Sequence, residues 1–284
     1  MPEGDTIYRA ARTLDRALAG HVVTGFESVF PHLTRVHEDA PITGRTVESV
    51  TARGKHVLMA FAGPSAPSAR SGEALVLRTH MRMNGSWHIY RHGETWQRGR
   101  RDMRIVVSTA GFVAVAFQVP VAEWLRPRDM ERHSELTKLG PDLLAEAFDA
   151  DEAIRRLRDR PDAEIADVLL NQRVMAGIGN VYKSEVLFAC GVSPFARVQA
   201  LTDGQIDCLV RTARKFLRAN VTEGLAAMTT YMGFRRTTRR DDPSERLWVY
   251  GRVDEPCRRC ATPIRIIKQG RDARLTYWCP TCQP

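Results

Sequence analysis

The sequence predicts a chain of several domains, in which β and α structure occupy different stretches. Short, β-branched and partly alternating segments run from residue 21 to about 126, helical periodicity dominates from about residue 131, and four cysteines lie in the last 28 residues. We therefore expect an N-terminal antiparallel β-sandwich with a flanking helix (1–130), a helical domain (131–246) and a C-terminal metal-held β-hairpin (247–284).

The N-terminal domain should begin with an amphipathic helix over residues 6–19, because Ile7, Leu14 and Leu18 fall on one face and Gly20 can end it. Strands should follow, separated by Gly, Pro and Ser turns, with residues 63–72 as a flexible surface loop. Repeated short strands at this spacing are typical of a sandwich or barrel. The expected strand segments are VVTGFESVF, TVESVTARGKHVLMAF, ALVLRTHMRM, GSWHIYRH, MRIVVSTAG and FVAVAFQV.

The helical domain should contain four helices, because four segments have apolar residues at helical spacing. An Arg-rich run, FRRTTRRDDPSER, lies within residues 229–246, and its polarity predicts a mobile loop or linker. The helical segments are DADEAIRRLRDR, DAEIADVLLNQ, NVYKSEVLFACG and TDGQIDCLVRTARKFLRANV.

The chain is basic, with 42 Lys and Arg against 33 acids, a formal charge of +9 and a pI near 9.6. This balance favours a polyanionic partner, first of all nucleic acid, although a basic protein without such a partner is an equal alternative. No stretch approaches the roughly 20 apolar residues of a membrane helix, and the charged N-terminus has no apolar signal core. We expect a cytoplasmic protein with no membrane association.

The cysteine spacing C-x2-C-x18-C-x2-C, formed by Cys257, Cys260, Cys279 and Cys282, predicts one structural zinc ion. Two CxxC pairs complete a tetrahedral shell and leave no open position for catalysis. A disulfide pair or chance spacing is the alternative. Cys190 and Cys208 stand alone in helical surroundings, so we expect no disulfide framework and a reducing compartment.

Two further features suit phosphate. Gly177 and Gly179 lie in a turn between helices, and the helix that starts near Asn180 should offer open amides to an anion. The predicted zinc-hairpin tip, Lys268–Arg274, holds three cations. A plain interhelical turn and a solvated hairpin tip are the alternatives.

Pro2-Glu3-Gly4-Asp5-Thr6 at the start, AGIGNVYKSE in the middle and the terminal four-cysteine module occur here in that order. Together they resemble the formamidopyrimidine-DNA glycosylase and endonuclease VIII family over nearly the whole chain. The resemblance implies a helix–two-turn–helix domain within residues 131–246. It also implies a base-excision-repair enzyme that is both a DNA glycosylase and an abasic-site lyase. Removal of Met1 would expose the amine of Pro2 as the nucleophile, and β,δ-elimination would cut the strand.

The resemblance also assigns roles to single residues. It implies acid–base help from Glu3, phosphate and opened-sugar contacts from Lys55, and backbone contacts from Asn180 and Arg274 beside Gly177 and Gly179. Met83 lies where family members insert a side chain into the duplex. An ordinary N-terminal acid, a surface lysine and a buried strand methionine are the alternatives for Glu3, Lys55 and Met83. Many relatives have a second acid where this chain has Thr6.

The branch of the family is predicted from two segments. The start PEGDT differs from the PELPE typical of oxidised-purine enzymes, and residues 112–125 contain no Arg-Phe pair. Both favour the endonuclease VIII branch, which acts mainly on oxidised pyrimidines. We expect a monomer that binds damaged duplex or single-stranded DNA, is associated with a bacterial nucleoid and needs no catalytic metal. An oxidised-purine glycosylase, a catalytically silent DNA-binding protein and, more weakly, a metal-dependent nuclease are the alternatives.

Overall fold

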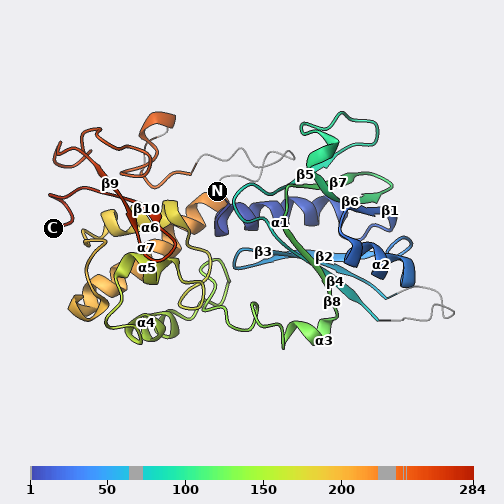
Figure 1. Cartoon of the computed structure of the whole chain (residues 1–284), viewed down its shortest axis with the longest axis horizontal. Coiled ribbons are helices and arrows are strands. Elements are labelled where there is room, and N and C mark those ends of the chain that lie inside the picture. Colours follow the sequence, from blue (N-terminus) through green and yellow to red (C-terminus); the bar gives the residue numbers. More distant parts are fainter. Residues whose placement is uncertain (1, 64–72, 223–234, 239, 241) are drawn as a thin grey trace. The chain divides into compact units, whose positions relative to one another are not determined.

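The structure, a computed structural model, describes residues 2–63, 73–222, 235–238, 240 and 242–284 (Figure 1). Contacts between residues divide the chain into two compact units. The first contains Pro2 and Thr6–Thr137, and the second contains Glu3–Asp5, residues 138–222 and the described residues from 235 to 284. Among the described residues, no helix is long and apolar enough to cross a membrane. The expected loop at 63–72 lies, except for Gly63, outside the described residues.

The first unit is a sandwich of two four-stranded antiparallel sheets, as expected (Figure 1). One sheet has the order β1 (Val23–Ser28), β6 (Met103–Thr109), β7 (Val113–Phe117) and β5 (Ser86–Tyr90). The other has the order β2 (Val47–Arg53), β3 (His56–Phe61), β4 (Leu75–His80) and β8 (Val121–Leu125). Inward side chains of both sheets share one buried core with Ile7, Leu14 and Leu18 of helix α1 (Gly4–Leu18).

The first unit differs from the expectation in four places. The long segment around residues 46–61 is a hairpin of β2 and β3, because Gly54 takes a φ of +58° and turns the chain. Residues 121–125 form β8, and β1 ends at Ser28, two residues before the expected end of the first strand at Phe30. Pro31, whose ring fixes φ, starts helix α2 (Pro31–Asp39), in which Leu33 is buried. A short helix, α3 (Pro127–Met130), follows β8.

The second unit contains the four expected helices, α4 (Ala150–Arg158), α5 (Ile165–Leu170), α6 (Asn180–Ala189) and α7 (Asp203–Thr222). They share a second apolar core. Helix α6 is buried from Asn180 to Phe188, on all its faces, so its polar side chains must find partners inside the protein. Short 3-10 turns occur at Val198–Ala200 and Pro243–Glu245, and a third, Arg100–Asp102, lies in the first unit.

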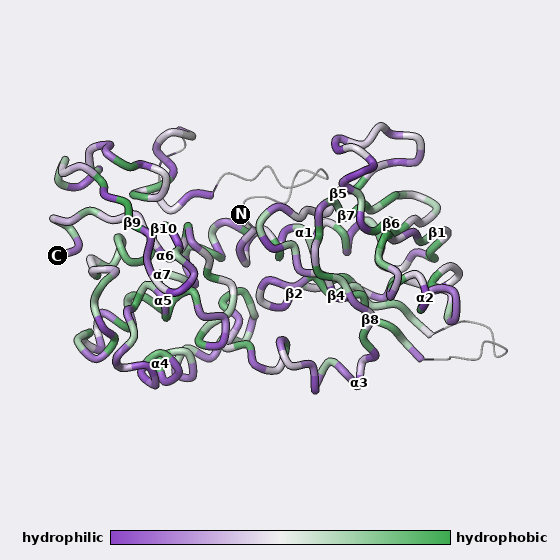
Figure 2. Tube along the Cα trace, viewed as in Figure 1, coloured by the Kyte–Doolittle hydropathy of each residue, from purple (hydrophilic) through white to green (hydrophobic). Residues whose placement is uncertain are grey.

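The C-terminal hairpin pairs β9 (Arg265–Gln269) with β10 (Arg274–Trp278), as expected. The hydrophobic stretch of β9 contrasts with the polar turn after it (Figure 2). Cys257, Cys279 and Ile264 pack against Phe188 of α6 and Val249 in a small core. The hairpin is therefore built onto the helical unit.

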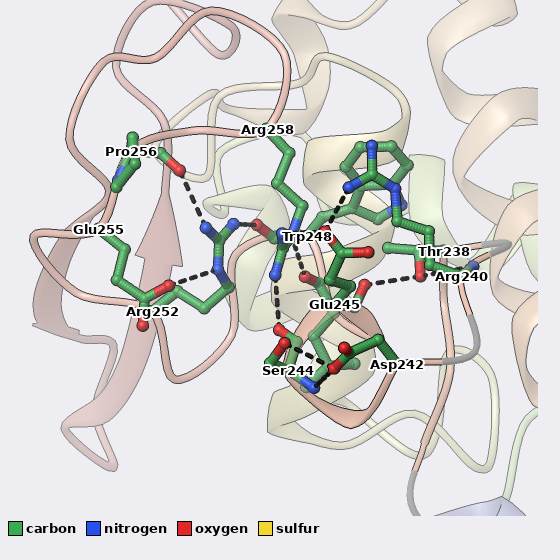
Figure 3. Close-up of polar contacts among 11 residues, drawn as sticks. Thr238, Arg240, Asp242, Ser244, Glu245, Trp248, Arg252, Glu255, Pro256 and Arg258 are labelled. Atoms are coloured by element: carbon green, nitrogen blue, oxygen red, sulfur yellow. Dashed lines mark hydrogen bonds and ion pairs between the residues drawn. The ribbon is translucent and has the colours of Figure 1, made fainter.

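The described part of the Arg-rich run is a loop with its own hydrogen bonds (Figure 3). The hydroxyl of Thr238 donates to the Glu245 carbonyl at 2.8 Å, and Arg240 donates to the Glu245 carboxylate at 2.6 Å. Arg258 donates to the Ser244 carbonyl at 2.6 Å. Arg240 of the run and Arg258 of the following segment thus both donate hydrogen bonds to residues 244 and 245, and polar contacts hold this loop together.

Cys190 and Cys208 form a disulfide, so the expectation that they stand alone is wrong. Cys190 caps the end of α6 and Cys208 lies in the second turn of α7. The chain turns between these helices and brings two cysteines 18 residues apart to a Cα–Cα distance of 6.0 Å. Their spacing in the sequence gave no sign of this turn.

Candidate functional site

Glu3 is completely buried, and its carboxylate binds the start of helix α6. It accepts hydrogen bonds from the backbone amides of Gly179 at 2.9 Å, Val181 at 2.8 Å and Tyr182 at 3.3 Å. These are amides that the first turn of a helix leaves without intrahelical partners. The positive end of the helix also favours the negative charge.

The anion at the start of α6 is thus a side chain of the same protein. We expected the first-turn amides to remain open to an outside anion, and for these three amides that expectation is wrong. Gly179, the N-cap residue, offers no side chain, and Glu3 takes the place of the missing cap. A Cβ atom on Gly179 would lie 2.3 Å from the Glu3 carboxyl carbon, so the turn requires glycine there.

A second contact joins the same two segments. The Gly4 amide donates to the Gly177 carbonyl at 2.8 Å, and a Cβ atom on Gly4 would lie 2.8 Å from the Gly177 Cα. Gly177 has a φ of +116°, in the region that favours glycine. The N-terminal motif and the glycine turn, 173 or more residues apart, are therefore two sides of one close backbone contact.

The acid at position 5 is engaged in a buried ion pair. Arg235 Nε donates to Asp5 Oδ2 at 3.0 Å, Nη2 donates to Oδ1 at 3.0 Å, and both side chains are almost fully buried. The Arg235 guanidinium lies 5.5 Å from the ring centre of Tyr182. Burial, followed by the charge of Asp5, raises the pKa of Tyr182 well above 10. Asp5 is therefore an acid with a fixed structural partner, while Thr6 is buried in the first unit.

Lys55 lies in the turn between β2 and β3 and is half-buried. Behind it the rings of His56 and His80 meet edge to face, with centroids 4.8 Å apart. Burial, then the charge of Arg78, lowers the pKa of His56 to about 2. Burial, then the charges of Arg82 and Lys55, lowers the pKa of His80 to about 4. Both imidazoles are neutral at physiological pH, and Lys55 is the cation of this turn.

Met83 is 51% exposed on a tightly closed turn between β4 and β5. The Gly85 amide donates to the Met81 carbonyl at 2.9 Å, and a Cβ atom on Gly85 would lie 2.5 Å from that oxygen. The Arg82 amide donates to His80 Nδ1 at 3.0 Å, and Arg98 reaches the Asn84 carbonyl at 3.3 Å. The alternative of a buried strand methionine is therefore wrong, because the turn holds this apolar side chain outward.

Asn180 contacts the hairpin next to Arg274. Asn180, the first residue of α6, donates through Nδ2 to the Leu275 carbonyl at 2.6 Å. Arg274, the neighbour of Leu275, is half-buried at the start of β10. The structure thus brings Glu3, Gly177, Gly179, Asn180 and Arg274 into one region of the second unit, whereas Pro2, Lys55 and Met83 belong to the first.

Two buried charges of α6 escaped the sequence analysis. Lys183 donates to the Leu275 carbonyl at 3.2 Å and to the Thr276 hydroxyl at 2.8 Å. The carboxylate of Glu185 accepts from the amides of residues 248–250 at 2.8–2.9 Å, and burial raises its pKa. Charged residues inside an otherwise apolar helix were the available signal, but their partners lie more than 50 residues away.

The four cysteine sulfurs fit a zinc ion. Their Sγ atoms all lie within 4.8 Å of one another, with three separations of 3.4, 3.5 and 3.9 Å. Four thiolates at about 2.3 Å from a tetrahedral zinc lie about 3.8 Å apart. The donor set and these distances indicate one structural zinc bound by Cys257, Cys260, Cys279 and Cys282, as expected.

Comparison with known proteins agrees with this architecture. The family description "Formamidopyrimidine-DNA glycosylase N-terminal domain" matches residues 1–120, and "Formamidopyrimidine-DNA glycosylase H2TH domain" matches residues 139–231. "Zinc finger found in FPG and IleRS" matches residues 254–284. The fold matches a crystal structure of Lactococcus lactis Fpg in complex with DNA containing an oxidised pyrimidine. The TM-score is 0.81, with 22% identity and 99% of each chain covered.

Full-length relatives decide the family. The whole chain is 39% identical to a protein of Streptomyces coelicolor named probable endonuclease 8 2, over 94% of that protein. It is also 38% identical to a Mycolicibacterium smegmatis protein named DNA-(apurinic or apyrimidinic site) lyase Nei2, over 99% of that protein. The resemblance seen in the three motifs is confirmed over the entire length, and the chain belongs to the formamidopyrimidine-DNA glycosylase and endonuclease VIII family of DNA-repair glycosylases and lyases.

Proposed function

We propose that the protein excises oxidised pyrimidines from damaged DNA and cuts the strand at the abasic site, with the Pro2 amine as nucleophile. The observation that carries this proposal is the fixed carboxylate of Glu3. Three backbone amides hold this carboxylate, and Glu3 directly follows the proposed nucleophile, Pro2, in the chain. The buried anion can stabilise a cation that forms on the neighbouring amine.

The chemistry follows from a terminal secondary amine. After loss of Met1, the Pro2 nitrogen attacks C1′ of the damaged nucleotide, the bond from C1′ to the base breaks, and the base leaves with the proton of the amine. The bond from C1′ to the ring oxygen O4′ then breaks, O4′ takes up a proton, and an iminium forms between C1′ and the Pro2 nitrogen. The resulting iminium withdraws electrons, so a base can remove a C2′ proton and expel the 3′ phosphate. A second elimination at C4′ expels the 5′ phosphate, and hydrolysis of the iminium releases the sugar fragment and the free amine.

The other residues hold DNA in this proposal. Lys55 is the cation next to the opened sugar and its phosphate, and Asn180 and Arg274 contact the backbone from the second unit. Gly177 and Gly179 shape the turn in which Glu3 sits. Met83, displayed on its closed turn, enters the duplex in place of the extruded nucleotide.

The preference for pyrimidines rests on the loop between β7 and β8. Only residues 118–120 join Phe117 to Val121, so this connection has no room for an inserted Arg-Phe loop of the oxidised-purine enzymes. The start PEGDT points the same way. We propose that the protein acts as a monomer in the bacterial cytoplasm, on duplex or single-stranded DNA.

The test is borohydride trapping on duplexes that contain an abasic site, one oxidised pyrimidine or one oxidised purine, with mass mapping of the adduct. We expect an adduct on the Pro2 amine, formed faster with the oxidised pyrimidine than with the purine, and weaker trapping for Pro2→Gly. Intact-mass measurement first establishes that Met1 is absent. If protein that lacks Met1 forms no adduct, a DNA-binding protein without catalysis is favoured. If the oxidised purine is trapped faster, the protein belongs with the oxidised-purine enzymes of the family.

A further inference from the structure

We propose that Lys183 is a positioning residue that fixes the hairpin arginine, Arg274, relative to Asn180, so that both contact the DNA backbone together. This inference rests on the proposed function. Lys183 Nζ donates to the carbonyl of Leu275 at 3.2 Å and to the hydroxyl of Thr276 at 2.8 Å. Asn180 Nδ2 donates to the same Leu275 carbonyl at 2.6 Å. Two residues of one helix face therefore hold the peptide unit next to Arg274.

The contact continues as a buried polar chain beneath the hairpin. The Thr276 hydroxyl donates to Gln269 Oε1 at 2.8 Å, across the strand pair from β10 to β9. Gln269 Nε2 in turn donates to Glu164 at 2.6 Å and to the Pro194 carbonyl at 2.9 Å. Both strands of the hairpin are therefore tied to the helical unit by hydrogen bonds that do not involve the cysteines.

The turn of the hairpin lies close to helix α5. Gly270 has a φ of +71°, and a Cβ atom there would lie 2.1 Å from a carboxylate oxygen of Asp167 on α5. The zinc cysteines Cys257, Cys260, Cys279 and Cys282 secure the opposite end of the module. Zinc and the hydrogen bonds that run from Lys183 through Thr276 to Gln269 thus hold different ends of the same hairpin. Arg274 lies at the end that zinc does not hold.

Burying an ammonium group costs desolvation free energy, and the hydrogen bonds of Lys183 to Leu275 and Thr276 offset part of that cost. Lys183 is 1% exposed, so it cannot touch DNA itself. Burial lowers its pKa to about 8, while the charges of Asp167 and Glu3 raise the pKa and that of Arg274 lowers it. Replacing a whole buried ion pair by apolar side chains is often neutral for stability, whereas removing one partner leaves the other uncompensated. Placement of Arg274 gives this lysine a function that an apolar side chain would lack.

The test measures DNA affinity against salt concentration for the wild type, Lys183→Met, Arg274→Ala and the double variant, on a duplex with a stable abasic-site analogue. We expect Lys183→Met to weaken binding about tenfold and to reduce the slope of log K against log salt by about one, as loss of one phosphate contact does. The double variant should bind like Arg274→Ala alone, because the lysine acts through the arginine.

Lys215→Met is the matched control, since it removes an exposed lysine of α7 in the same unit. Any effect of this variant should add to that of Arg274→Ala. Additive effects of Lys183→Met and Arg274→Ala, or unchanged binding by Lys183→Met, would overturn the proposal.

Zinc content and thermal unfolding show whether Lys183→Met is folded. If it loses zinc, Thr276→Val breaks the same chain beyond the lysine, and the same non-additivity with Arg274→Ala is required of it. The readout here is equilibrium DNA binding. A failed borohydride trap would therefore refute the proposed chemistry, whereas the coupling between Lys183 and Arg274 would still be decided by the binding measurements.

Discussion

At the scale of single residues, Glu3 explains the glycines on both sides of its contact. Gly179 leaves room for the carboxylate, and Gly4 lets the N-terminal backbone approach Gly177. Because three backbone amides hold Glu3, its position depends on the turn as much as on α1. The position of Glu3, the residue that follows the proposed nucleophile, is therefore set by residues near position 180.

Gly179→Ala tests this dependence. The φ of Gly179 is −124°, which alanine adopts without strain, so the added methyl acts only by displacing Glu3. We expect borohydride trapping on abasic DNA to slow by about 10- to 100-fold, since small displacements of reacting groups have effects of this size. Overpacking should lower the free energy of unfolding by about 1–3 kcal/mol.

Gly111→Ala is the control for this prediction, because its Cβ would meet nothing within 4 Å. It should trap DNA and unfold like the wild type. A Gly179→Ala protein that traps DNA at the wild-type rate would show that the carboxylate does not need this position.

Residues that belong to short motifs could be predicted from the sequence, whereas residues that depend on distant partners could not. Four cysteines at fixed spacing predict their own site, because each pair already lies close together. The partners of Lys183 lie 92 and 93 residues away, and Asp5 and Arg235 are 230 residues apart. A buried charge in a helix indicates that a partner exists but does not identify that partner.

At the scale of elements, α6 organises the second unit because its polar side chains bind two different neighbouring segments. Asn180 and Lys183 hold the hairpin, while Glu185 caps the turn at residues 248–250. The apolar periodicity was enough to predict the helix. It could not predict that all faces are buried, which depends on the surrounding elements. β8 and α2 were missed because they are short and their burial depends on the sandwich.

The disulfide at the end of α6 gives a prediction at this scale. Cys190–Cys208 closes a loop with a sequence separation of 18 and joins α6 to α7. We expect reduction to lower the free energy of unfolding of the helical unit by about 3 kcal/mol, chiefly by releasing the unfolded chain. Urea unfolding with and without a phosphine reductant, at constant zinc, measures the change.

The double variant Cys190→Ser/Cys208→Ser supplies the control, since it should unfold like the reduced wild type and be insensitive to the reductant. Identical unfolding curves for oxidised and reduced wild type would contradict a stabilising disulfide.

At the scale of the whole molecule, the two units have separate hydrophobic cores, while the zinc module shares its core with the helical unit. Cys257 and Cys279 pack with Phe188 of α6 and with Val249, whose amide is bound by Glu185. No residue of the sandwich core belongs to this cluster among the described residues. Loss of zinc should therefore spread into the helical unit and stop before the sandwich.

Zinc removal by a chelator, followed by hydrogen exchange and DNA binding, tests this division. A module of about 30 residues cannot keep its fold on apolar burial alone, so the hairpin should unfold and its DNA contacts should be lost. Protection should fall at the amides of Trp248, Val249 and Tyr250, which depend on the packing of the module, and stay unchanged in β3 and β4. Readdition of zinc should restore both protection and affinity. A chelated protein with undiminished DNA affinity would show that the hairpin is not needed for binding, and loss of protection in β3 and β4 would show that the units do not unfold separately.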